Sequence, residues 1–350
     1  MMEGPMRPEL RLDSAVFRAN IAAVRDRLGD STLMLVLKDD AYGHGLRWAV
    51  ETALEAGVTS FGSYDVRGGV EVRRIAGGEV TVFAWATSTD EEIDEALLQD
   101  IELGVGTVEY LRRIAARAEV LGVRARIHLK IDTGLHRNGV RPEDWAAAVA
   151  EAREAERSGA LALVGVWSHI AEASDAEDDE AQAVFLDAVR QVGLTGPQPA
   201  SVHLTASAAS WWRPELRGTV SRIGAFCYGI RSADGPDLDG VRPAARLVAP
   251  VVRVEGESAI VAVGSLDGVP STLAGMTVGT PVGSRAVSTI DVATMTVEGW
   301  PEMAVGDEVT VFGPGAQGEE TATTLAERID TVGEEILTRL GPRIRRRVVD

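Results

Sequence analysis

The chain has 350 residues, of which 45% are hydrophobic, and its formal net charge is -18 at pH 7. A chain of this length can bury one large core or two ordinary ones. Nucleic acids and anionic membranes bind basic surfaces, so the negative charge predicts that neither is a partner. The single cysteine, Cys227, excludes an internal disulfide and is typical of a cytosolic protein. Residues 1–12 hold no apolar segment of signal-peptide length and no later run could span a bilayer, so we expect a soluble, cytoplasmic protein.

Strand and helix patterns alternate from the N-terminus onward. Residues 9–12 read as a short strand, and Asp13 and Ser14 offer caps for a helix that continues to Leu28. Strand-like runs then occur at 32–38, 60–64, 80–86, 101–106, 126–132, 161–169, 200–205 and 219–228. Between them lie helical segments such as 141–159, in which apolar residues share one helical face. Eight strands alternating with helices predict an α/β fold, the (β/α)8 TIM barrel. No strand is followed by the glycine fingerprint of a dinucleotide fold, which disfavours a doubly wound open sheet.

From residue 241 the pattern changes to short β-rich runs separated by Gly, Pro, Asp and Ser turns. The predicted strands include 249–254, 258–263 and 308–312, with one helix near 323–329 and a last strand at 335–340. The arginine-rich run 343–347 is interpreted as a solvated C-terminal tail. The sequence therefore predicts two domains, a (β/α)8 barrel over residues 8–240 and a smaller all-β domain over residues 241–350.

Lysine is almost absent from this chain. Only Lys38 and Lys130 occur, so thirty-three of the 35 basic residues are arginine. Arginine stays charged at any working pH, whereas a desolvated lysine amine can lose its proton and attack a carbonyl to form a Schiff base. Lys38 closes the apolar run 33–37 and precedes a glycine-rich turn, so we expect it to be a reactive amine at a strand end.

Other polar residues also fall where predicted strands end, and in a barrel of this kind the catalytic site lies at those ends. They are Tyr42, Lys130, Asp132, Arg137, His169, the segment 203–207, Arg222 and Gly224. The five histidines all lie in or beside these segments. No two histidines have the spacing of a metal-ligand pair, so we expect no metal site. The pattern predicts one polar site at the rim of the barrel.

Two of these segments resemble motifs of the alanine racemase family. The sequence KDDAYGHG at 38–45 resembles the attachment motif for pyridoxal 5'-phosphate, and HLKIDTGLHRNG at 128–139 resembles the family's second motif. Weaker similarity occurs at 168–169, 203–208 and 221–229, and the resemblance extends over about residues 8–345. It implies a barrel followed by a β domain. It also implies a pyridoxal-phosphate-dependent amino-acid racemase, an isomerase that acts on a small amino acid as a homodimer.

The resemblance implies roles for the residues that would hold the cofactor. Lys38 would bind it as an aldimine and, once released by substrate, act as the base on one face of Cα. Tyr42, Ser207 and the backbone of Gly224 and Ala225 would bind the phosphate through hydroxyl and N–H groups. With Lys38, the implied catalytic residues are Arg137 and His169.

The remaining roles concern the ring of the cofactor. His169 would pack on the ring or its supports, and Arg222 would donate to the pyridine nitrogen. An arginine there leaves that nitrogen unprotonated, so the ring is a weaker electron sink. Arg137 would reach the phenolic oxygen and the substrate carboxylate. Lys130 is carbamylated in many family members, and the resulting negative charge would orient Arg137.

The sequence departs from the family at the second catalytic base. In the family this base is a tyrosine from the β domain of the partner subunit. The four tyrosines of this chain are Tyr42, Tyr64, Tyr110 and Tyr228, and none lies in the predicted β domain. The segment that would carry the tyrosine is missing between Val254 and Ile260. A C-terminal phosphate-binding tyrosine is also missing, with Gly333 near its place, and Ala206 replaces the asparagine expected before Ser207.

Three interpretations remain open. The first, favoured because the strong motifs are those of racemases, is an amino-acid racemase whose second base is another group, for which the β domain offers carboxylates such as Asp267 or Asp291. The second is a one-base enzyme of the same fold, such as a decarboxylase, lyase or aldolase. The third is a non-catalytic protein that binds the cofactor.

Overall fold

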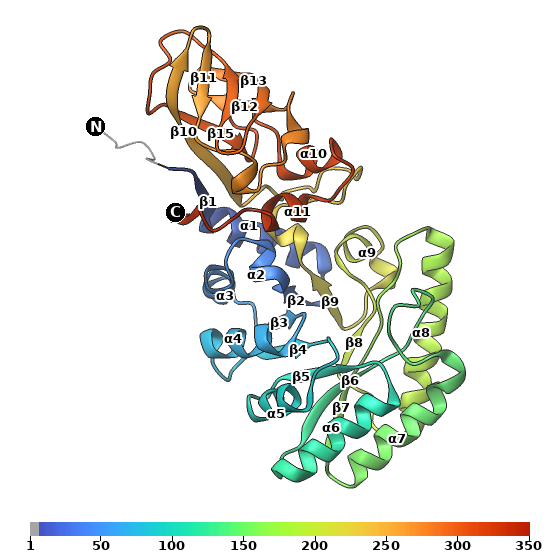
Figure 1. The fold of residues 1–350 in the computed structure, drawn as a ribbon. Coiled ribbons are helices and arrows are strands. Elements are labelled where there is room, and N and C mark those ends of the chain that lie inside the picture. The colour runs from blue at the N-terminus through green and yellow to red at the C-terminus, as the bar shows by residue number, and fades with distance from the viewer. Residues whose placement is uncertain (1–6) are drawn as a thin grey trace. The chain divides into compact units, whose positions relative to one another are not determined.

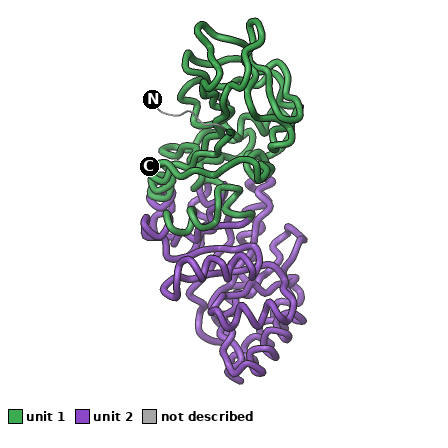
Figure 2. Tube along the Cα trace, turned by 60° about the vertical axis from the view of Figure 1, so that its left-hand side comes forward, with its two compact units in different colours: residues 1–23, 39–52, 225–350 green, residues 24–38, 53–224 purple. Residues whose placement is uncertain are grey.

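The computed structural model describes residues 7–350, which form two compact units (Figures 1 and 2). The barrel unit comprises residues 24–38 and 53–224. Of the described residues, the sheet unit comprises 7–23, 39–52 and 225–350. Because residues 1–6 lie outside the described chain, the expectation about a signal segment at 1–12 falls partly outside it. Within residues 7–350 no helix is both long enough and apolar enough to cross a membrane.

The barrel unit contains eight parallel strands, and each of the eight predicted strand positions is confirmed. The strands are β2 (Thr32–Val36), β3 (Ser60–Ser63), β4 (Thr81–Ala84), β5 (Glu102–Val105), β6 (Ala125–Lys130), β7 (Leu161–Trp167), β8 (Ser201–His203) and β9 (Val220–Ile223). Their order in the sheet is β8-β7-β6-β5-β4-β3-β2-β9, so sequential strands are neighbours except where β9 pairs with β2. This order is that of a barrel, with β8 and β9 as the two strands that must meet.

Thr219 brings β8 and β9 together. Its hydroxyl donates to the carbonyl of Ala200 at 2.7 Å and accepts from the N–H of Val202 at 2.8 Å. The neighbouring residue is Gly218. Any side chain at this position would collide with the backbone of β8, because its Cβ would lie 1.9 Å from the Val202 carbonyl oxygen. A side-chain link thus joins these two strands, and glycine permits the close approach of their backbones.

Helices alternate with the strands, as the sequence predicts (Figure 1). They are α1 (Ser14–Leu28), α2 (Lys38–Tyr42), α3 (Leu46–Glu55), α4 (Val66–Ala76), α5 (Asp90–Leu98), α6 (Val108–Leu121), α7 (Trp145–Arg157), α8 (Asp175–Thr195) and α9 (Ser207–Trp212). In α7 the buried side chains include Trp145, Ala148, Val149 and Ala152, the apolar face expected for segment 141–159. The inner core of the barrel unit contains Met34, Phe83, Trp167 and Val220.

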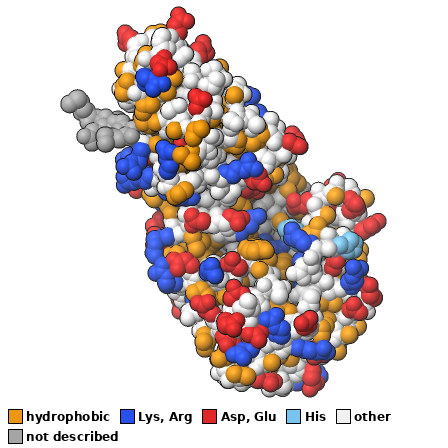
Figure 3. Space-filling view, in the orientation of Figure 1, with side chains coloured by type: hydrophobic (Ala, Val, Ile, Leu, Met, Phe, Trp, Pro, Cys, Tyr) orange, Lys and Arg blue, Asp and Glu red, His pale blue; other side chains and the backbone are white. Residues whose placement is uncertain are grey.

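Charged side chains on the barrel unit pair with one another. Arg113 of α6 contacts Asp90 of α5 at 2.6 Å, and Arg112 of α6 contacts Glu151 of α7 at 2.8 Å. On the face seen in Figure 3, basic side chains lie among acidic ones. Exposed pairs of this kind each stabilise a fold by at most about 1 kcal/mol. These ion pairs join neighbouring helices, and the arginines in them are paired with carboxylates of this same unit.

The sheet unit contains eight strands, several of them antiparallel hairpins. They are β1 (Glu9–Asp13), β10 (Ala245–Glu255), β11 (Ser258–Val261), β12 (Thr277–Thr280), β13 (Gly283–Ile290), β14 (Met295–Glu298), β15 (Glu308–Phe312) and β16 (Arg345–Val349), in the order β11-β14-β13-β12-β15-β10-β1-β16. The long strand β10 also pairs with β11, so β10 to β15 close on themselves. Strand β1 comes from the N-terminus and pairs with β10 and β16. The domain division between residues 240 and 241 stays a prediction.

Three predictions near strand ends are wrong. The segment 335–340 is no strand but belongs mainly to helix α11 (Gly333–Thr338), which follows helix α10 (Ala322–Glu327). Ile336, Leu337 and Leu340 are all buried, a spacing that suits a helix face.

The run 343–347 is no free tail, because β16 pairs in parallel with β1. The predicted strand 219–228 stops at 223, and residues 225–228 form a 3-10 turn. The sequence pattern does not predict β16, because an edge strand of arginines lacks the apolar alternation by which strands are recognised.

The segment after Lys38 has an unusual backbone. Asp39, Asp40, Ala41 and Tyr42 all have positive φ angles between 52° and 56°, which makes α2 a left-handed turn. Such a conformation costs about 1 to 2 kcal/mol for each residue that carries a Cβ. Local hydrogen bonds offset part of this cost, including Gly43 N–H to the Asp39 carbonyl and Leu46 N–H to the Asp40 side chain. The motif therefore holds a conformation that its residue types do not favour.

This strain predicts that substitution of alanine by glycine changes the free energy of unfolding less at residue 41 than in an ordinary helix. We expect Ala41→Gly to leave the free energy of unfolding nearly unchanged, because relief of the positive φ offsets the lost methyl group and the added freedom of the unfolded chain. The control Ala150→Gly, at an exposed site inside α7, should destabilise the protein by about 1 kcal/mol. Urea denaturation followed by circular dichroism measures both. Equal losses in the two variants would show that residue 41 is not strained.

Candidate active site

Four cationic side chains gather around His169 in the barrel unit. Lys38 and Lys130 lie at the ends of β2 and β6, Arg137 follows in the loop after β6, and Arg222 lies in β9. Burial, and then the charges of these four groups with Arg222 the strongest, lower the pKa of His169 to about 3. Parallel strands bring their carboxyl ends to one edge. This concentration of positive charge lies in a chain of net charge -18, and it is the setting for an anionic ligand.

Lys130 is a lysine whose environment disfavours its charge. Its side chain is buried, and Nζ lies 4.6 Å from the centre of the Trp167 ring. Burial lowers the pKa of Lys130 to about 8, Arg137 and Arg222 lower it as well, and Asp132 opposes them. A substantial fraction of this amine is therefore neutral near pH 8.

The loop that carries Arg137 is organised by Asp132. Its carboxylate accepts from the N–H groups of Gly134 and His136 at 3.1 and 3.0 Å, and it contacts the His136 ring at 3.0 Å. The loop closes where the Val140 N–H donates to the Lys130 carbonyl at 2.8 Å. The hydrogen bonds of Asp132 and His136 thus give both residues a structural role in this loop. Their role is to shape the loop from which Arg137 extends.

Arg222 is a buried guanidinium whose two terminal nitrogens are occupied by the protein. Nη1 donates to the ring Nδ1 and the carbonyl of His203 at 2.9 and 3.1 Å. Nη2 donates to the carbonyls of Ser168 and Leu204 at 2.8 and 3.2 Å, and lies 3.3 Å from Nδ1 of His169. None of residues 7–350 accepts a hydrogen bond from Nε of this arginine. Burial lowers the pKa of Arg222 to about 9, so the group is still cationic at neutral pH.

Ser207 and Gly224 lie side by side at the ends of β8 and β9. The Gly224 N–H donates to the Ser207 hydroxyl at 3.2 Å; Ser207 is half-buried and Gly224 is buried. Ala206, just before α9, makes no side-chain cap for that helix. A backbone N–H beside a hydroxyl is a donor pair that a phosphate can use.

The other two predicted cofactor ligands, Tyr42 and Ala225, belong to the sheet unit. The Tyr42 side chain is buried beside the backbone of Ala225, and its ring centre lies 5.2 Å from that of Tyr228. Burial raises the pKa of the Tyr42 phenol well above its usual value, so the group stays protonated and able to donate. In the barrel unit, Lys38, Lys130, Arg137 and Arg222 thus surround His169, and Ser207 pairs with Gly224. The other two predicted residues lie in the sheet unit.

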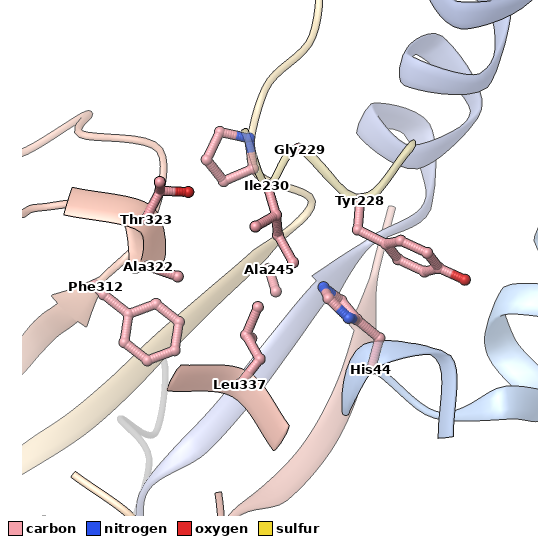
Figure 4. A pocket seen from close by; sticks show the side chains of 10 residues that line it. His44, Tyr228, Gly229, Ile230, Ala245, Phe312, Ala322, Thr323 and Leu337 are labelled. Carbon is pink, nitrogen blue, oxygen red and sulfur yellow. The ribbon is translucent and has the colours of Figure 1, made fainter. Parts of the chain in front are cut away.

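A small cavity in the sheet unit lies against His44 (Figure 4). Tyr228, Ala245, Phe312 and Leu337 are among its walls, and its volume of about 10 Å³ is room for about one water molecule. Nδ1 of His44 lies 2.9 Å from the Ala41 carbonyl, so this nitrogen carries the proton, and the buried Nε2 has no hydrogen-bond partner among residues 7–350. The cavity is far too small for an amino acid or a cofactor.

The sheet unit shows how the tyrosine-bearing segment is missing. Strands β10 and β11 are joined by Gly256 and Glu257 alone, with Glu255 paired to Ser258. Gly256 has a φ of 58°, which a two-residue hairpin of type II′ requires at this position. Strands β10 and β11 are therefore joined by a tight two-residue turn, with one register shift between Val251 and Arg253.

The two carboxylates considered as a second base differ in their surroundings. Asp267 is fully buried, accepts from the Gly264 N–H at 3.0 Å and lies 3.3 Å from Nε of Arg343. Asp291 is exposed beside the turn between β13 and β14. Asp267 is engaged in holding its own loop, so Asp291 is the more available of the two. Within the described chain, residues 7–350, no cluster of three or more His, Cys, Asp or Glu side chains is placed to hold a metal ion.

Comparison with known proteins gives these features a context. The family model described as alanine racemase, N-terminal domain, matches residues 12–232, and the one for the C-terminal domain matches residues 250–348. The alanine racemase of Thermobifida fusca is 34% identical, with 97% of each chain covered.

Solved structures agree with this similarity. The alanine racemase of Streptomyces coelicolor superposes with a TM-score of 0.92 at 29% identity and covers 98% of both chains. That of Clostridium difficile, in complex with cycloserine, has a TM-score of 0.88 at 25% identity and covers 98% of this chain and 95% of its own. The barrel strands, the all-β C-terminal part and the match along nearly the whole chain place this protein in the alanine racemase family.

Proposed function

We propose that this protein is a pyridoxal-phosphate-dependent racemase of alanine, with Lys38 as the residue that holds the cofactor. The observation that carries the proposal is the gathering of Lys38, Lys130, Arg137 and Arg222 around His169 in a member of this family. The cycloserine bound by the C. difficile relative is a small cyclic amino-acid analogue, which supports an amino-acid substrate. We infer a cytoplasmic location from the sequence.

The residues present fit this cofactor. A phosphate and a phenolic oxygen are anionic and suit the cationic cluster, and the free Nε–H of Arg222 suits an acceptor such as a ring nitrogen. When bound, the cofactor supplies an electron-withdrawing ring that acidifies the Cα–H of an attached amino acid. Nζ of Lys38 would then accept that proton from one face of Cα and return it. Ser207 and the Gly224 N–H of the barrel unit would bind the phosphate. The phosphate roles of Tyr42 and Ala225 stay predictions from the resemblance.

Arg137, His169 and Lys130 would complete the site. Arg137 would bind the substrate carboxylate, and uncharged His169 would pack against the ring. Carbamylation of Lys130 needs the neutral amine, which a pKa of about 8 makes available. The product would be an anion beside Arg137 and Arg222, the two cations that disfavour a charged lysine there. We infer that the carbamate is the preferred state of Lys130.

The two lysines allow a direct test of these roles. After borohydride reduction of the holoenzyme, peptide mass spectrometry should find the cofactor on Lys38, and Lys38→Arg should carry none, because arginine forms no Schiff base. The control Lys130→Arg should still carry it, but should lose the carbamate ¹³C resonance that the parent gives in ¹³C-bicarbonate. That resonance should grow as the pH rises toward 8, where more amine is neutral. Cofactor attached to Lys130 would overturn the assignment.

The missing tyrosine predicts a slow and one-sided reaction. Acid–base help on one face is worth a factor of about 10² to 10⁴ in rate. In D₂O, with alanine as substrate, deuterium should enter one enantiomer faster than the enantiomers interconvert by roughly that factor. NMR of the exchange, with chiral chromatography of the product, measures both rates.

Two further outcomes of that experiment are informative. Racemisation as fast as exchange would mean that a second base is present, and a loss of rate in Asp291→Asn but not in a Val305→Ala control, at another exposed site of the sheet unit, would identify it. Exchange without any racemisation would favour the one-base alternative over the racemase.

We also propose that the protein is a homodimer. Leu266 and Val292 of the sheet unit are 58% and 66% exposed and are neighbours, since the Leu266 N–H donates to the Val292 carbonyl at 2.8 Å. Exposed apolar neighbours are suited to burial against a second copy. Sedimentation at micromolar concentration should give twice the chain mass, and Leu266→Glu should shift the protein toward monomer more than Leu194→Glu, at an exposed site of α8. A monomeric parent would contradict the proposal.

A further inference from the structure

A line of buried polar groups runs through the barrel interior behind Arg222. Its members are His203 of β8, His128 of β6 and Glu102 of β5, and each is at most 3% exposed. Nε2 of His203 lies 2.7 Å from Nδ1 of His128, and Nε2 of His128 lies 2.7 Å from Oε2 of Glu102. The other oxygen of Glu102 accepts from Nε of Arg126 at 2.9 Å.

The proton positions along this line follow from its first member. A guanidinium can only donate, so Nδ1 of His203, 2.9 Å from Arg222, must be the bare acceptor. Nε2 of His203 then carries the proton and donates to Nδ1 of His128, which is therefore also bare. Nε2 of His128 donates to the carboxylate of Glu102, which in its ionised form can only accept hydrogen bonds. Each hydrogen bond thus points from Arg222 toward Glu102, and a single arrangement satisfies all of them.

The surroundings keep this arrangement from exchanging with water. Phe83 lies 4.5 Å from the His128 ring and 5.3 Å from the His203 ring, and Trp167 stacks on His203. Gly165 makes room for His128, because a Cβ there would lie 2.0 Å from its Nδ1. In such a setting a donor or acceptor without a partner costs about 1 to 3 kcal/mol.

The charges agree with this order. Burial, and then the neighbouring groups His128 and Arg222, disfavour a protonated His203, so the pKa of His203 lies well below its usual value. The hydrogen bonds from His128 and Arg126 outweigh burial and lower the pKa of Glu102. The line therefore begins with a cation, ends with an anion and is neutral between them.

We propose that Glu102 is a positioning residue for Arg222, acting through the fixed tautomers of His128 and His203. The carboxylate at the far end keeps His203 an acceptor toward Arg222, which aims the guanidinium so that its Nε–H is left for a ligand. Without an acceptor at residue 102, His128 either leaves a buried N–H unsatisfied or shifts its proton to Nδ1. The shift would set two N–H groups against each other and force His203 to present an N–H to Arg222.

The test of the tautomers needs no cofactor and no activity. Labelling the full chain with ¹⁵N-histidine gives five imidazoles, which His128→Gln and His203→Gln assign. Long-range ¹H–¹⁵N spectra should show both rings protonated at Nε2 and bare at Nδ1. Finding either ring protonated at Nδ1 in the parent would overturn the proposal.

Matched variants of residue 102 separate positioning from packing. In Glu102→Gln the amide oxygen can still accept from His128, because Arg126 is 45% exposed and can turn away from the amide group. We expect unchanged tautomers. In Glu102→Leu both imidazole patterns should change. Arg126→Gln removes the other partner of Glu102 and should leave the tautomers as they are. If Glu102→Leu does not fold, the parent spectrum and the two glutamine variants still decide the matter.

The effect on the cofactor rests on the proposed function and is measured separately. In full-length holoenzyme, Glu102→Leu should weaken pyridoxal-phosphate binding about 10- to 100-fold, the value of a hydrogen bond to a charged group, and should alter the visible spectrum of the bound ring. Glu102→Gln should restore most of both. Correct tautomers with equal affinities in all variants would mean that the line exists but does not position Arg222. No binding in the parent would instead contradict the proposed function alone.

Discussion

The burial of one guanidinium sets the requirements for much of the barrel unit. Arg222 is 4% exposed, and a buried cation is tolerated only when acceptors surround it. The carbonyls of Ser168, His203 and Leu204 supply them from the ends of β7 and β8. These carbonyls reach one guanidinium only when β7, β8 and β9 keep their register. The burial of Arg222 therefore depends on the register of these three strands, and a shift in register would leave the buried cation without acceptors.

The same constraint explains why the barrel interior is not wholly apolar. A parallel barrel is ordinarily filled by branched aliphatic side chains. Here two imidazoles and a carboxylate occupy part of that space, and Phe83 and Trp167 pack against the imidazoles. Replacing such a line by apolar groups could stabilise the fold, whereas removing one member leaves its neighbours unsatisfied. A polar line of this kind is better explained by a need to orient Arg222 than by stability.

A second departure from low energy occurs in the segment that follows Lys38. Four residues with side chains adopt the left-handed conformation, and the carbonyls of Asp39 and Asp40 and the Asp40 side chain accept local hydrogen bonds. Strain of this kind is characteristic of functional sites, where the surrounding structure enforces it. In the sheet unit, the turn between β10 and β11 shows the opposite: its positive φ falls on Gly256, a residue without a Cβ.

The sequence by itself determined the alternation of eight strands and helices and the change to β structure after the barrel. It is also the source of the proposal that Lys38 is the reactive amine. These follow from local signals: apolar periodicity, turn residues and the scarcity of lysine. Tertiary structure alone decided that β16 pairs with β1, because an edge strand of arginines has no apolar pattern and its partner lies at the other end of the chain. It also decided that Glu102 and Arg126, ordinary charged residues at strand starts, meet His128 and His203. Such contacts depend on the register between strands far apart in sequence, which side-chain periodicity within one strand does not specify.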